Sequence, residues 1–203
     1  MKKIIGGFAI GISGVGLHML ALWVADTYVE SFPGVTDIVM RQLPFIDLFG
    51  IGEILFLVLM VGFGVILLRD RWCDLGYILA LLGIFYACRG VFLILLPIGP
   101  PLDAPEVAER FVLYPYAGHA FFPGGHVGIM FILTLLVRSR TLRISCTVAV
   151  LLFGLGSIIT RAHYTADIAG GLLLAYAVWA FGERYLKKYF TPQQNALPQK
   201  ETF

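Results

Sequence analysis

Apolar residues along this chain fall into long runs separated by short polar connections. A helix needs about 20 apolar residues to cross a bilayer, and most of the runs approach that length. The fourth run is short unless it begins near Pro123, which places His126 in its first turn. The pattern predicts an all-α polytopic membrane bundle of six transmembrane helices. The runs cover approximately Ile4–Val24, Leu48–Leu68, Leu75–Leu96, Val127–Val137, Ile144–Ile159 and Tyr164–Phe181.

The composition places the chain in lipid. Hydrophobic residues make up 59% of it and charged residues 14%, with a mean hydropathy of +0.85. Its 203 residues can hold about six crossings with short connections and no separate soluble domain. We therefore expect one transmembrane catalytic domain over residues 1–185 and a polar, disordered cytoplasmic tail over residues 186–203. The first run lacks a convincing signal-peptidase site after it and is interpreted as a retained helix.

Basic residues are concentrated in alternate connections, which predicts the orientation. By the positive-inside rule the connections that carry them are cytoplasmic, as are both termini. The long connections 26–47 and 97–122 then lie outside, and the second contains a capping pattern for a surface helix at Asp103, Pro105 and Glu106. The short loops favour a prokaryotic plasma (inner) membrane. The basic residues that define the cytoplasmic side are Lys2, Lys3, Arg69, Arg71, Arg138, Arg140, Arg143, Arg184, Lys187 and Lys188.

Charge and cysteine content exclude some classes of function. A formal net charge of +2 gives no basic surface for nucleic acid. The three cysteines are scattered and match neither a metal site nor a disulfide framework. We therefore expect membrane lipids as partners, and no nucleic acid.

Ionisable residues inside the apolar runs need a reason, because a charged side chain at mid-helix costs roughly 2.5–3.5 kcal/mol on insertion scales. His18, Glu53 and Arg89 are such residues, and all three fall in the outer half of the membrane. An ion pair with Glu53 and the binding of phosphate are equal alternatives for Arg89. His18 and His119 are expected to be structural hydrogen-bonding groups.

Two motifs place histidines at helix starts on the outer side. Gly124 and Gly125 precede His126, and glycines with free N–H groups at a helix start let a phosphate approach the backbone. His163 and Asp167 are four residues apart, so one helical face presents both and the carboxylate can orient the imidazole. A histidine prepared in this way is a candidate nucleophile or base.

The pattern Pro123-Gly124-Gly125-His126, followed by His163-Tyr164-Thr165-Ala166-Asp167, resembles the type 2 phosphatidic acid phosphatase superfamily. It is most similar to the branch of the sphingomyelin synthases and phosphatidylcholine:diacylglycerol cholinephosphotransferases. The resemblance covers about residues 88–175. It implies that His163 is the nucleophile, that Asp167 orients it and that His126 is the general acid and base. Substrate-binding candidates are Arg89, Gly124, Gly125, Arg161 and Tyr164.

The resemblance implies a phospholipid donor, a lipid alcohol or water as acceptor, and neither metal nor cofactor. Gly124 replaces the superfamily's serine, and Arg161 lies only two residues before His163. Fewer phosphate-binding cations suit a zwitterionic phosphodiester better than a phosphomonoester, which favours a phosphotransferase. The alternatives are a phosphatase acting on phosphatidic acid or an isoprenoid diphosphate, and a non-catalytic lipid-binding or transport protein.

Overall fold

The computed structural model describes residues 2–29, 33–47, 51–102 and 122–190, and every regular element within these ranges is helical. The all-α class is confirmed. A 3₁₀ turn, Trp72–Asp74, joins α3 to α4, and a π-helical turn, Gly182–Leu186, leads from α7 into α8. The helices are α1 (Lys2–Tyr28), α2 (Ile38–Gln42), α3 (Ile51–Arg71), α4 (Leu75–Leu95), α5 (Gly125–Leu136), α6 (Arg140–Ile159), α7 (Thr165–Phe181) and α8 (Lys187–Phe190).

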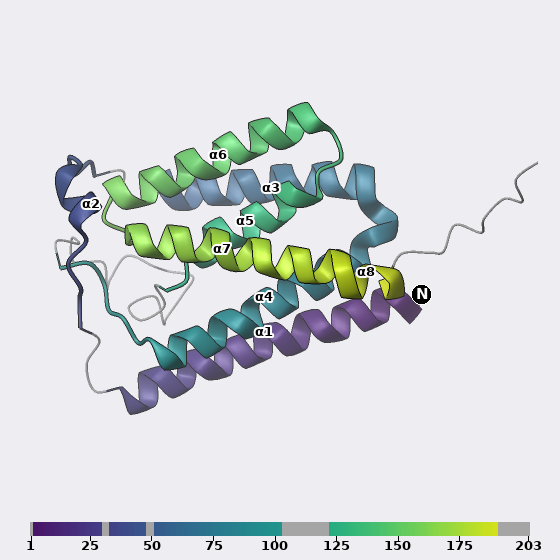
Figure 1. Cartoon of the computed structure of the whole chain (residues 1–203), viewed down its shortest axis with the longest axis horizontal. Helices are drawn as coiled ribbons and strands as arrows, with labels where there is room; N and C mark the ends of the chain where they lie inside the picture. The colour runs from purple at the N-terminus through teal and green to yellow at the C-terminus, as the bar shows by residue number, and fades with distance from the viewer. Residues whose placement is uncertain (1, 30–32, 48–50, 103–121, 191–203) are drawn as a thin grey trace, which may run out of the picture.

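Four helical stretches in the described part are long and apolar enough to cross a membrane: Lys3–Tyr28, Ile51–Leu95, Arg140–Ile159 and Thr165–Phe190. The second contains both α3 and α4, which run in opposite directions on either side of the 3₁₀ turn (Figure 1). Helix α5 is apolar but has only 12 residues. These lengths are compatible with an integral membrane protein.

Helix α5 occupies the centre of the bundle. It contacts α3, α4, α6 and α7, whereas α1 lies at the edge and packs along α4 (Figure 1). The α1–α4 contact is a backbone approach, because a Cβ atom at Gly7 or Gly14 would lie 2.0 or 1.9 Å from a carbonyl oxygen of α4. Such close crossings are typical of helices that associate in lipid.

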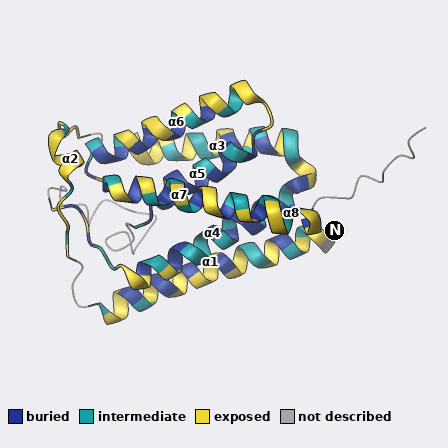
Figure 2. Cartoon of the chain, viewed as in Figure 1, coloured by how far each residue is buried: buried dark blue, intermediate teal, exposed yellow. Residues whose placement is uncertain are grey.

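The outer surface of the bundle is apolar, as expected for contact with lipid. Figure 2 shows exposed faces along α1, α3 and α6, and buried positions turned toward α5. The exposed side chains include Ile12, Val61 and Leu152, which are more than half accessible. Inside, Phe85 of α4 and Met130 of α5 are fully buried.

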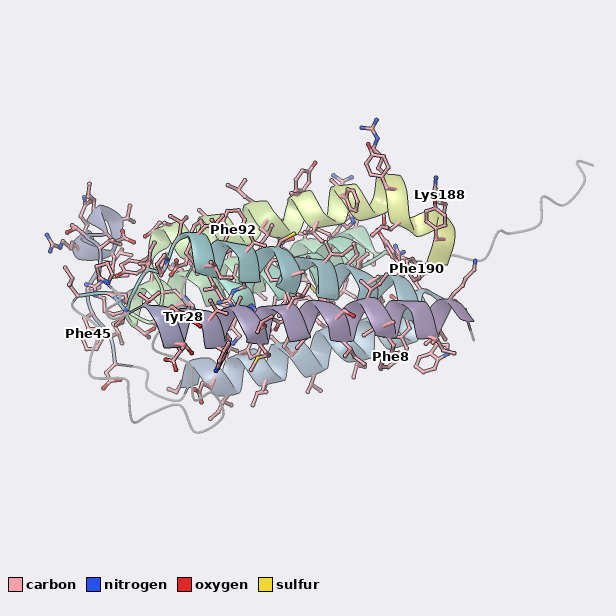
Figure 3. All side chains as sticks on the ribbon, turned by 90° about the horizontal axis from the view of Figure 1, so that it is seen from below. Phe8, Tyr28, Phe45, Phe92, Lys188 and Phe190 are labelled. Carbon is pink, nitrogen blue, oxygen red and sulfur yellow. The ribbon has the colours of Figure 1, made fainter. Side chains whose placement is uncertain are left out.

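The two ends of the bundle differ in their residues. The histidine end comprises α2 and the starts of α5 and α7, and the basic end comprises the α3–α4 turn, the α5–α6 turn and α8. In Figure 3, Phe45 marks the first end, and Lys188 and Phe190 mark the second. The helical body continues to Phe190, five residues beyond the expected boundary at 185. The surface helix expected after Asp103 lies outside the described residues, as does His119.

Candidate active site

The histidines of the two motifs lie side by side at the histidine end. His126 is in the first turn of α5, and His163 is in the turn between α6 and α7. Their ring centroids are 6.2 Å apart, with an interplanar angle of 73°. The ring of Phe56 from α3 also packs on His126, at 4.2 Å between centroids. Residues 37 positions apart in sequence are thus brought together, with one of the two rings supported by a neighbouring helix.

Asp167 holds His163 through its side chain. Its Oδ2 atom lies 3.4 Å from His163 Nδ1 and accepts a 3.0 Å hydrogen bond from the backbone N–H of Tyr164. Asp167 is 1% exposed and belongs to the capping box of α7. Because the carboxylate is fixed by the helix start, it can keep the imidazole in one orientation.

The turn that carries His163 is closed by backbone hydrogen bonds and by Arg161. The Ser157 carbonyl accepts from the N–H groups of Ala162 and His163, at 2.9 and 3.1 Å. Arg161 adopts φ +58°, a left-handed conformation that a non-glycine residue rarely adopts. Its guanidinium donates to the backbone carbonyls of Met40 and Leu43, so Arg161 holds α2 against this turn. Binding of substrate by Arg161 stays a prediction.

Asp37 is a second anchor for the same turn. It accepts hydrogen bonds from the Thr165 N–H at 2.6 Å and the Thr165 hydroxyl at 3.2 Å, and it caps α2 through Val39 and Met40. Partial burial raises the pKa of Asp37, but the hydrogen bonds from Met40, Thr165 and Val39 outweigh it and hold the pKa below its ordinary value. Asp37 was not predicted from the sequence, although its position directly before α2 is an N-cap signal.

Tyr164 joins three segments. It is 2% exposed, its hydroxyl donates to the Pro100 carbonyl at 2.9 Å, and it accepts from the Val35 N–H at 3.0 Å. These bonds connect the start of α7 to the segments before α2 and after α4. The structure gives Tyr164 a structural role, and its contact with substrate stays a prediction.

Arg89 reaches the start of α5 from α4. Its Nε donates to the Pro123 carbonyl at 2.7 Å, and its Nη1 lies 2.8 Å from His18 Nε2. A Cβ atom at Gly125 would lie 3.0 Å from Arg89 Nε, so the guanidinium is packed directly against the glycine that precedes His126. The alternative partner, Glu53, is exposed on α3, and no ion pair joins it to Arg89 among the described residues.

Gly124 allows α5 and α7 to meet. Its N–H donates to the Asp167 carbonyl at 2.8 Å, and a Cβ atom at this position would lie 2.9 Å from that oxygen. A Cβ atom at Gly171 of α7 would lie 2.4 Å from the Gly124 carbonyl. A serine at position 124 would therefore crowd the contact that joins the two motifs, which gives a physical reason for the glycine.

The donors at this site suit a phosphate better than a metal ion. Among the described residues, no group of three or more His, Cys, Asp and Glu side chains is arranged to hold a metal. The site instead combines a buried guanidinium and a helix start, which are groups that bind anionic oxygens, with two imidazoles.

Comparisons with known proteins give no family for this chain. A scan against models of protein families finds no match, and a search of curated proteins finds no significant relative. The geometry of the site and the resemblance carried by the two motifs are therefore the support for a function.

Proposed function

We propose that the protein is a membrane enzyme that transfers a phosphorylated headgroup from a phospholipid to a lipid alcohol through a phosphohistidine. The 6.2 Å separation of the His126 and His163 rings carries the proposal. An attacking nitrogen lies about 3–3.5 Å from the atom it attacks, and a general acid lies about 3 Å from the atom it protonates. The ring centroids of His126 and His163 are close enough for a nitrogen of each ring to approach one phosphoryl group bound between them.

The residues supply each step of a two-stage transfer. The Nε2 atom of His163 attacks the phosphorus, an N–P bond forms, the P–O bond to diacylglycerol breaks, and His126 gives its proton to the departing oxygen. An acceptor alcohol then attacks the phosphohistidine, its proton passes to His126 and the N–P bond breaks. Asp167 orients His163 and stabilises its positive charge.

The surroundings fit a phosphodiester. In-line phosphoryl transfer needs mainly positioning and electrostatic stabilisation, which Arg89 and the amide groups at the start of α5 can provide. Of the two arginines in the predicted substrate set, Arg161 directs Nη1 to the Met40 carbonyl of α2 and Nη2 to the carbonyl of Leu43, the residue that follows α2. One well-placed guanidinium supports a zwitterionic donor over a doubly charged phosphomonoester.

The test is a transfer assay on the full chain in nanodiscs. Headgroup-labelled phosphatidylcholine or phosphatidylethanolamine is offered with mixed lipid alcohols, and we expect labelled product from the wild type and none from His163→Ala. Leu173→Ala, an exposed change on α7, the helix that follows His163, is the matched control and should retain turnover. Transfer that persists in His163→Ala would eliminate the proposal.

The same assay separates the alternatives. Free phosphate released from phosphatidic acid or an isoprenoid diphosphate, without an alcohol acceptor, would indicate a phosphatase. Specific retention of one lipid class without turnover of any would indicate a binding or transport protein.

The proposal includes six crossings in a type 2 phosphatidic acid phosphatase-like bundle, with the histidine end outside. Cys73 is exposed at the basic end, in the α3–α4 turn, and Ile46 is exposed near the histidine end. A membrane-impermeant maleimide should label Cys73 only from the cytoplasmic side. In a Cys73→Ser background, Ile46→Cys should be labelled only from outside, and the reverse result would invert the topology.

A further inference from the structure

His18 is a buried polar residue on α1. The residues beside it, Leu17 and Met19, are exposed to lipid, yet His18 is 1% exposed. It faces α4 where that helix has a glycine, since a Cβ atom at Gly90 would lie 3.1 Å from His18 Cα. This close approach brings the imidazole to Arg89, the residue before the glycine.

The contact with Arg89 fixes the tautomer of His18. A guanidinium nitrogen donates and never accepts, so His18 Nε2, 2.8 Å from Arg89 Nη1, accepts and is unprotonated. The proton of the neutral ring therefore lies on Nδ1, which is buried and has no hydrogen-bond partner in the part of the chain that the structure describes. Burying an unsatisfied donor at Nδ1 is unfavourable. The hydrogen bond that Nε2 accepts from Arg89 offsets this cost and gives a reason for a histidine at this position.

The guanidinium is held at two points. Nη1 donates to His18 and Nε donates to the Pro123 carbonyl, which places contacts from α1 and from the start of α5 on one planar group. Hydrogen bonds at both Nε and Nη1 restrict the rotation of the guanidinium plane. Groups held in advance in the geometry that a developing charge requires do not have to reorganise during the reaction.

We infer that His18 is a positioning residue, which holds Arg89 in the orientation that presents the guanidinium to the phosphate group of a ligand beside His126. The inference rests on the proposed function for its catalytic consequence. The effect of the His18 Nε2 acceptor on the binding of a phosphate-like anion can be tested without any turnover.

Two substitutions of similar size isolate the acceptor. His18→Gln places an amide near the position of Nε2, and His18→Met has a similar length but no comparable acceptor for Arg89. Leu22→Ala, at a buried position one turn further along α1, removes packing and leaves the Arg89 hydrogen bonds intact. Should His18→Met fail to fold, His18→Phe keeps a ring without an acceptor and replaces it.

The measurements are the apparent Kd of orthovanadate, from its stabilisation of the full chain in nanodiscs, and kcat in the transfer assay. Losing a hydrogen bond to a charged group should weaken vanadate binding and lower kcat roughly tenfold in His18→Met. His18→Gln should stay within about threefold of the wild type on the same scale. Leu22→Ala should lower the melting temperature alone.

The outcomes distinguish this inference from the proposed function. Equal vanadate affinity in His18→Met, His18→Gln and wild type would overturn the inference, even if lipid transfer is observed. Weaker vanadate binding in His18→Met alone, in a protein that turns over no lipid, would support the inference and overturn the proposed function. A wild type that does not bind vanadate would overturn the inference.

Discussion

The two ends of the bundle use their charges differently. At the basic end, charged side chains pair with one another: Asp74 lies 3.1 Å from Arg71 and 3.8 Å from Arg138, and Glu183 lies 2.6 Å from Lys187. Glu183 and Lys187 are partly exposed and Arg138 is mostly exposed, so their pairs contribute little to stability. Asp74 itself is buried and depends on Arg71 as its close partner. The excess of positive charge is predicted to set the orientation in the membrane.

At the histidine end, charged side chains bind the backbone. Arg89 donates to the Pro123 carbonyl, and Arg161 donates to two carbonyls in and directly after α2. Asp37 and Asp167 accept from N–H groups at the start of α7. A side chain bound to the backbone of another segment fixes the position of that segment. Similar residue types thus pair with one another at one end and fix the geometry of the histidine pair at the other.

Asp167→Asn should give the largest effect of the changes that compare the two ends. The amide can still accept from the Tyr164 N–H, so the helix start is retained, but it cannot stabilise a positively charged His163. By analogy with aspartates that orient catalytic histidines, kcat should fall by about 10²- to 10⁴-fold in the transfer assay.

Asp74→Asn is the matched change at the basic end. It removes the partner of Arg71 and Arg138, so it should lower the melting temperature and leave kcat within about twofold, because no reacting group is near. Equal losses of turnover in the two variants would contradict the division between the ends.

Gly124→Ser should have the next largest effect, although it introduces the serine of the superfamily motif that this chain resembles. The new Cβ atom would lie 2.9 Å from the Asp167 carbonyl oxygen, and relieving such overpacking costs about 1–3 kcal/mol. We expect a lower melting temperature together with slower headgroup transfer, since Asp167 must move.

Gly62→Ser is the control for this change, because a Cβ atom there has no neighbour within 4 Å. It should leave both the melting temperature and the rate of transfer near the wild-type values. Faster transfer by Gly124→Ser at an unchanged melting temperature would show that the site accommodates the serine and uses its hydroxyl.

Periodicity in the sequence was enough to predict the long helices but not the contacts that assemble the site. The run expected over Leu75–Leu96 is α4, and the alternative start near Pro123 did place His126 in the first turn of α5. Helix α6 begins at Arg140, four residues before its apolar run, because charged residues in a first turn lower hydropathy without preventing helix formation.

The missed features depend on contacts between distant residues. Helix α2 has five residues, too few for a periodic signal. The bond from Thr165 to Asp37 spans 128 positions, and the crowding at Gly124 arises only when α7 lies against α5. Sequence motifs identified His126, His163 and Asp167 as candidates. The contacts by which Asp37, Arg89 and Arg161 fix the surrounding segments could be seen only in the structure.

Asp37→Ala should lower stability by about 1 kcal/mol, as expected for loss of an N-cap, with an effect that depends on pH. The pKa of Asp37 is lower in the folded state than in the unfolded state. Its stabilisation is therefore fully present above the unfolded pKa of about 3.9 and is lost as the pH falls through the folded value.

The difference in melting temperature between wild type and Asp37→Ala should thus be largest near neutral pH and shrink in acid. Thr165→Val, which removes the hydroxyl but keeps the backbone N–H, should show a smaller difference with the same sign. A difference that grows in acid would mean that Asp37 is protonated in the folded state, contrary to its four accepted hydrogen bonds.

Arg138→Ala should have the smallest effect and tests the basic end directly. The Arg138 side chain is 63% exposed and its contact with Asp74 is long at 3.8 Å, while Arg71 remains as the closer partner of that carboxylate. An exposed pair of this kind contributes about 0–1 kcal/mol, so the melting temperature should change little and the rate of transfer should not change. If this substitution slowed transfer as much as Asp167→Asn, the charges at the two ends would be coupled through the bundle, and the histidine end could not be treated as a separate, locally fixed site.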